Sequence, residues 1–69
     1  MSYRLTPLGE NRARRVVQTQ GPEDSVLTFL YETKDPADFD EIANETQMDD
    51  ATARKVVNRL VLKELVKEV

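Results

Sequence analysis

The chain contains no cysteine and no histidine. These absences exclude disulfides, the usual zinc ligand sets, thiol nucleophiles and the side chain that most often acts as a general base. No apolar run approaches the roughly 18 residues needed to span a bilayer, and the first residues lead into no signal-peptide core. We therefore expect a soluble, cytoplasmic protein that is not an enzyme, holds no metal or cofactor and does not enter a membrane.

The chain is also short, since its 69 residues are fewer than a typical domain contains. At this length folding buries only about 60% of the surface that the unfolded chain exposes, which leaves a net stability of roughly a few kcal/mol. A buried enzyme cleft would be hard to house in so small a core. We expect one domain over residues 1–69, without linkers or repeats.

The net charge is small, but the charged residues are unevenly distributed along the chain. The net charge is −3, which by itself argues against a nucleic-acid binder, because such proteins usually carry a basic excess. Residues 1–20 carry a net charge of +3, residues 51–69 again carry +3, and residues 21–50 carry ten acids and one lysine. This asymmetry indicates either a functional basic face or a bias that serves solubility.

The first half of the chain predicts a strand and two helices. Tyr3 to Leu5 alternates as a short strand does. Thr6 is suited to cap a helix that runs from Pro7 to about Thr19. A second helix is predicted from about Glu23 to Tyr31, and it must end before Pro36 because the residue preceding a proline avoids the helical region.

The second half predicts two further helices and a strand. Asp38 and Glu41 have the spacing of a capping box, which opens a short helix. The clearest helical periodicity runs from Ala51 to about Leu62, after Asp49 and Asp50 as candidate caps. Its predicted buried face consists of Ala53, Val56, Val57, Leu60 and Val61. Leu65 to Val69 predicts a final strand.

This second half carries a motif that is degenerate but ordered. Its parts are Glu41-Ile42-Ala43, Met48, the cap Asp49, the helical stretch Thr52 to Leu60, and Lys63 to Val66. They resemble the helix-turn-helix and first wing strand of the winged helix-turn-helix DNA-binding superfamily, from about Ala37 to Val69. The resemblance implies a mainly α fold with a small β-wing. Gln47 and Glu64 depart from it, because glycine is usual at both positions and tolerates a left-handed backbone that glutamine and glutamate resist.

The N-terminus carries a second, shorter resemblance. The stretch Tyr3 to Glu10 is similar to the returning wing strand and following helix start of the same superfamily, although here it comes first. We therefore predict that Tyr3 to Leu5 pairs with Leu65 to Val69, as though the order of elements were permuted. An unpaired apolar terminal strand would otherwise leave an edge prone to aggregation. The alternatives are pairing with a second copy, or a chain that is the start of a longer protein.

The resemblance implies that the helix from Ala51 to Leu62 enters the major groove of DNA, whose width admits a helix. The residues expected to contact DNA are Thr52, Arg54, Lys55, Asn58, Arg59 and Lys63. Arg59 and Lys55 are the candidates for guanine, Asn58 for adenine, and Thr52 for phosphate. Additional phosphate contacts are assigned to Arg12, Arg14 and Arg15. For both sets the alternative is an ordinary solvated helix face.

We therefore interpret the sequence as a small DNA-binding protein, either a transcriptional regulator or a phage-like or plasmid-like accessory factor. Its expected partner is double-stranded DNA, with a homodimer or a protein partner as further options. The rival hypothesis is a winged-helix module that binds proteins and not DNA, which the acidic middle segment favours. Catalysis is not expected.

Overall fold

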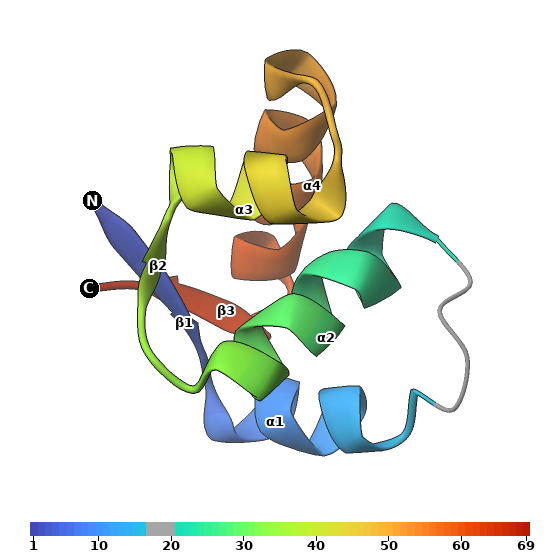
Figure 1. Ribbon diagram of the computed structural model, residues 1–69. Coiled ribbons are helices and arrows are strands. Elements are labelled where there is room, and N and C mark those ends of the chain that lie inside the picture. Colours follow the sequence, from blue (N-terminus) through green and yellow to red (C-terminus); the bar gives the residue numbers. More distant parts are fainter. Residues whose placement is uncertain (17–20) are drawn as a thin grey trace.

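The computed structural model describes residues 1–16 and 21–69. This part of the chain forms four helices and a small three-stranded antiparallel sheet (Figure 1). In chain order the elements are β1 (Ser2–Leu5), α1 (Pro7–Arg14), α2 (Pro22–Thr33), β2 (Ala37–Asp38), α3 (Phe39–Thr46), α4 (Asp50–Leu62) and β3 (Val66–Glu68). No helix in the described ranges has the length and apolar character needed to cross a bilayer.

The sheet has the order β2-β1-β3, so that the N-terminal strand is its centre. Leu5 lies opposite Val66, and the backbone N–H of Val69 donates to the carbonyl of Ser2 at 2.8 Å. The two termini consequently lie side by side (Figure 1). The predicted pairing of the first and last strands is confirmed. Strand β2 was not predicted, because two residues are too few to show an alternating pattern.

Helix α1 begins as predicted but is shorter. The hydroxyl oxygen of Thr6 accepts a hydrogen bond from the N–H of Gly9 at 3.0 Å, and Pro7 occupies the first turn. The helix ends at Arg14, and the next two N–H groups bond three residues back, as in a tightened final turn. The prediction of a helix to about Thr19 is therefore wrong at residues 15 and 16. Helix α1 buries only Gly9 and Ala13, so little packing is present to extend it. Residues 17–20 lie outside the described residues.

A close backbone approach joins α1 to the turn before β3. A Cβ placed on Gly9 would lie 1.9 Å from the carbonyl oxygen of Leu65. Beside this contact, the Thr6 hydroxyl donates to the Glu64 carbonyl at 2.6 Å. Gly9 is a poor helix former, but its lack of a Cβ allows α1 to approach the turn before β3.

The core lies where α2, α3 and α4 pack together and against the sheet. Its largest fully buried side chains are Val26, Leu27, Ile42, Val57, Leu60 and Val66. Helix α1 packs on α2 at the lower side of the view in Figure 1. The predicted buried face of α4 is confirmed except at Val61, which is 38% exposed. Val61 lies at the edge of the stripe, over a surface groove and not over the core.

The turns between these elements have left-handed backbone at the two positions where glycine was expected. Gln47 has φ 57° and ψ 38° at the end of α3, and Glu64 has φ 62° before β3. The N–H of Met48 donates to the carbonyl of Ala43 at 3.0 Å, which closes the turn between α3 and α4. The chain therefore keeps a glycine-like backbone at both sites without glycine.

Candidate nucleic-acid interface

Helix α4 presents one buried and one exposed face. All six residues assigned to DNA contact are exposed, and they lie on α4 or at its C-terminal cap, Lys63. Arg54 and Asn58 share one row of the helix surface, and Lys55, Arg59 and Lys63 share the neighbouring row, since residues four apart lie above one another. The structure thus brings the predicted set together on one surface.

The start of α4 is defined by Asp49 and Thr52. Asp49 has extended backbone at the N-cap, although its side chain makes no capping hydrogen bond to the helix. The largest cause of a lowered pKa at Asp49 is a hydrogen bond from the Thr52 side chain, which favours the charged carboxylate. The resulting contribution to stability is present above the pKa of the unfolded chain and is lost as pH falls through the lowered folded value.

Arg54 is directed toward the start of α3. Its guanidinium carbon lies 5.1 Å from the centre of the Phe39 ring, a cation–π distance. Arg54 and Asn58 also line a depression of about 420 Å³, whose wall includes Tyr3 and Asp40. Arg54 is thereby positioned by α3, and Asn58 is exposed in the lining of the depression beside it.

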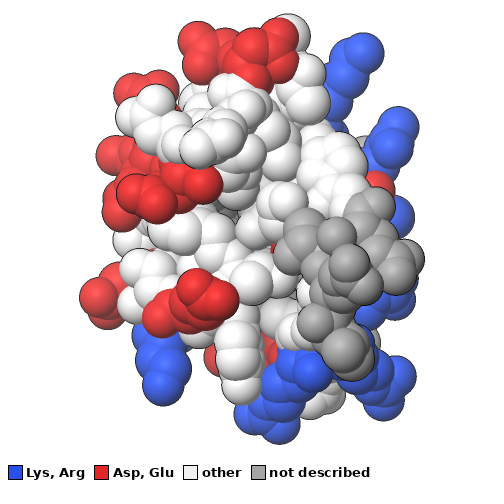
Figure 2. Space-filling model, turned by 45° about the vertical axis from the view of Figure 1, so that its right-hand side comes forward, with Lys and Arg blue, Asp and Glu red and all other residues white. Residues whose placement is uncertain are grey.

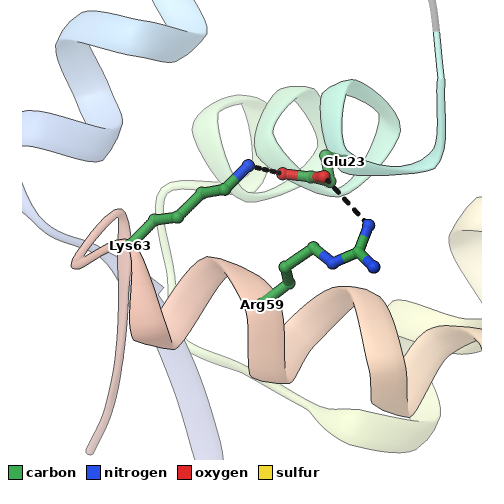
Figure 3. Close-up of polar contacts among 3 residues, drawn as sticks. All are labelled: Glu23, Arg59 and Lys63. Carbon is green, nitrogen blue, oxygen red and sulfur yellow. Dashed lines mark hydrogen bonds and ion pairs between the residues drawn. The ribbon is translucent and has the colours of Figure 1, made fainter.

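Arg59 and Lys63 are directed toward the N-terminus of α2. Lys63 Nζ lies 2.8 Å from Glu23 Oε1, and Arg59 Nη1 lies 3.9 Å from Glu23 Oε2 (Figure 3). In the sequence, Glu23 only marks the approximate start of the second predicted helix. Lys63 follows it by 40 positions, so no local pattern could reveal the pair.

Lys55 differs from these neighbours in having no fixed partner. Within the described residues, no carboxylate lies at ion-pair distance from its ammonium group. Its side chain is exposed, one helical turn before Arg59. Of the basic residues on α4, Lys55 is therefore the one whose charge a ligand meets without displacing a contact.

The three arginines assigned to phosphate contact do not form one cluster. All are exposed on or just after α1. Arg12 and Lys63 line one depression near the start of α2, whereas Arg14 lines another with Tyr31 and Lys34, near the end of α2. Arg12 thus extends the α4 surface, and Arg14 belongs to a different side.

The sheet adds two basic side chains that sequence reasoning did not select. Arg4 and Lys67 are directly opposite each other on β1 and β3, and both are exposed. Like charges opposite each other in a sheet oppose pairing, so this pair brings no stability of its own. The signal in the sequence was the predicted pairing of the two terminal strands.

On the face shown in Figure 2, most acidic side chains lie at the top and left and most basic side chains along the right edge and bottom, with one further basic side chain at the lower left beside acidic ones. Among the described residues, no group of three acidic side chains is arranged to hold a metal ion. Asp38 instead caps α3, because its carboxylate accepts from the N–H of Glu41 at 2.8 Å.

A second surface feature is apolar. A groove of about 500 Å³ runs between α1, the end of α4 and β3, and it is lined by Thr6, Pro7, Leu8, Val61, Glu64, Val66, Lys67 and Glu68. Leu8 is 55% exposed beside it, and Leu62, on the next position of α4 after Val61, is 83% exposed. These side chains lie outside the predicted DNA-contact set.

Comparison with known proteins adds no relative, because no family model, curated protein or solved structure matches the chain.

Proposed function

We propose that the chain is a small DNA-binding protein without catalytic activity, in which α4 enters the major groove. The observation that carries this proposal is the division of α4 into a buried apolar face and an exposed face with five of the predicted contact residues, which Lys63 continues at the C-terminal cap. A free helix face of this kind fits the groove, and its side chains are long enough to reach base edges.

The arrangement of elements supports a winged-helix interpretation of the fold. Helices α3 and α4 are joined by a short turn, β3 follows α4, and β3 pairs with β1 at the centre of the sheet. In this proposal β1 replaces the returning wing strand, so the fold is a winged helix with its order permuted. Arg4 and Lys67 then lie on the wing, suited to contact phosphate.

Roles within α4 follow from side-chain chemistry and from the contacts described above. Lys55 and Asn58 are the proposed base readers, because lysine suits guanine and asparagine suits adenine. Arg59 reads guanine when it leaves Glu23. Thr52 at the helix start and Lys63 at its end contact phosphate.

A fluorescence anisotropy titration with a labelled mixed-sequence duplex tests the proposal. We expect measurable but weak binding at about 50 mM salt that is lost near physiological salt, because few phosphates are neutralised and counterion release is modest. Absence of binding at about 50 mM salt contradicts the proposal.

The second candidate function is protein interaction, which the apolar groove favours. Exposed Leu8 and Val61 line the same groove and form more contiguous apolar surface than singly scattered side chains would. Its partner would be a second copy or another protein. Sedimentation equilibrium of the parent and of Leu8→Asp distinguishes the cases: a dimer that the substitution dissociates supports self-association through this groove.

A further inference from the structure

Glu23 forms ion pairs with two cations of the proposed DNA-binding surface. Its carboxylate oxygens lie 2.8 Å from Lys63 and 3.9 Å from Arg59 (Figure 3). The Glu23 side chain is 29% exposed, while those of Arg59 and Lys63 are 68% and 50% exposed. The acid is thus partly enclosed by α2 and α4, and the two cations remain open to solvent on their outer side.

We propose that Glu23 is an intramolecular competitor of DNA phosphate that sets the affinity of the α4 surface. The inference rests on the proposed function. A carboxylate and a phosphodiester use the same donors, so Lys63 must give up its 2.8 Å contact before it binds phosphate at full strength. While the contact persists, the negative charge of Glu23 lies between two cations of this surface and weakens the attraction of both for phosphate.

The position of Arg12 makes the effect larger than one pair. Arg12 lines the same depression as Glu23, Asp24 and Lys63, which measures about 350 Å³. With glutamine at position 23, Arg12 from α1 and Lys63 after α4 would face this depression together with the N-terminal end of the α2 dipole, and Asp24 would be the acid that remains there. Phosphate would then meet two cations and one acid in place of two cations and two acids.

The alternative is that Glu23 only stabilises the fold. Exposed ion pairs contribute little to stability, and a first-turn acid gains from the helix dipole with or without Lys63. A purely structural role predicts that removing the charge lowers the melting temperature and leaves DNA affinity changed only through net charge. The two roles therefore give different binding results.

The experiment compares Glu23→Gln with Glu32→Gln by anisotropy, using a labelled mixed-sequence duplex of about 20 base pairs at about 50 mM salt. Both substitutions remove one negative charge from α2, and Glu32 is exposed at the opposite end of the helix. We expect Glu23→Gln to tighten binding about three- to tenfold and to steepen the salt dependence by about one phosphate contact. Glu32→Gln should tighten binding by less than about twofold.

Lys63→Met, made in the parent and in the Glu23→Gln background, completes a double-mutant cycle. We expect it to weaken binding about twofold in the parent and about fivefold or more when Glu23 is neutral, because the lysine is then available to phosphate. Circular dichroism verifies that each variant is folded.

Equal tightening by Glu23→Gln and Glu32→Gln, or the same loss from Lys63→Met in both backgrounds, overturns this inference and leaves the proposed function standing. If the parent and every variant fail to bind duplex DNA at low salt, both the inference and the proposed function are wrong.

Discussion

Leu60 is the residue on which the packing of α4 depends most. Its side chain is fully buried in the cluster formed with α2 and the sheet. Leu60→Ala should cost about 2–5 kcal/mol, which is comparable with the whole stability of a domain of this size, so the variant should be largely unfolded by circular dichroism. Leu62→Ala, on the exposed face of the same helix, is the control and should melt near the parent. Similar melting of both variants would mean that the facing of α4 is wrong.

At Gly9, helix propensity favours alanine, whereas tertiary packing requires glycine. Alanine is the better helix former by about 1 kcal/mol. However, its Cβ would lie 1.9 Å from the Leu65 carbonyl oxygen, which is backbone and cannot turn away. We expect Gly9→Ala to lower the free energy of unfolding in urea by about 1–3 kcal/mol. Glu10→Ala should change it by less than about 0.5 kcal/mol; a more stable Gly9→Ala variant would contradict the approach of α1 to β3.

Gln47 and Glu64 offer sites for stabilisation. Both have left-handed backbone, which costs a residue with a Cβ about 1–2 kcal/mol and costs glycine little. Part of this gain is lost because glycine raises the conformational entropy of the unfolded chain. Gln47→Gly and Glu64→Gly should therefore each raise the free energy of unfolding by about 0.5–1 kcal/mol. Glu45→Gly, inside α3, should lower it, and a loss at all three positions would argue against the left-handed turns.

At the scale of the element, α4 and α1 can be compared through matched charge reversals. Lys55→Glu is preferred to a change at Arg59, because Arg59 contacts Glu23 and its reversal would also place two acids together. We expect Lys55→Glu to weaken duplex binding about tenfold or more, since it removes a base contact and adds repulsion. Thermal stability should change by less than about 0.5 kcal/mol.

Arg14→Glu provides the control, with the same change in charge on a different side of the molecule. It should weaken binding by less, and alike on every DNA sequence, because it alters only long-range attraction. Equal losses from the two reversals would indicate a diffuse electrostatic surface with no recognition helix.

The elements differ in how far the sequence predicts them. Helix α4 was predictable nearly to the residue, since its apolar spacing and a preceding acid are local signals. The capped start of α3 and the pairing of the terminal strands were also predicted, and both are present. Strand β2 has two residues and exists only because β1 lies beside it, so it leaves no local signal.

The candidate site divides in the same way. Exposure of Thr52, Lys55 and Asn58 follows from helical periodicity. The contacts of Arg59 and Lys63 with Glu23 depend on how α2 and α4 cross, which the sequence does not encode locally. The early end of α1 and the exposure of Val61 likewise depend on where tertiary contacts stop.

At the scale of the whole molecule, the fold explains how a chain with a net charge of −3 can present a basic surface. The two basic ends of the sequence meet because β1 pairs with β3 and Arg12 approaches Lys63. Glu23 and Asp24 lie at this basic surface, whereas Asp38 and Asp40 lie at the start of α3. Net charge therefore gives a poor measure of the local field that a DNA phosphate would meet.

The most direct test of the central claim, that α4 is the DNA-contacting element, is an amide chemical-shift titration of the isotopically labelled protein with duplex DNA at low salt. We expect the largest shifts on the exposed face of α4, above all at Thr52, Lys55, Asn58 and Arg59, with smaller shifts at Arg4 and Lys67. Shifts distributed over α1 and α4 alike, shifts confined to the groove around Leu8 and Val61, or no shifts at all would contradict it.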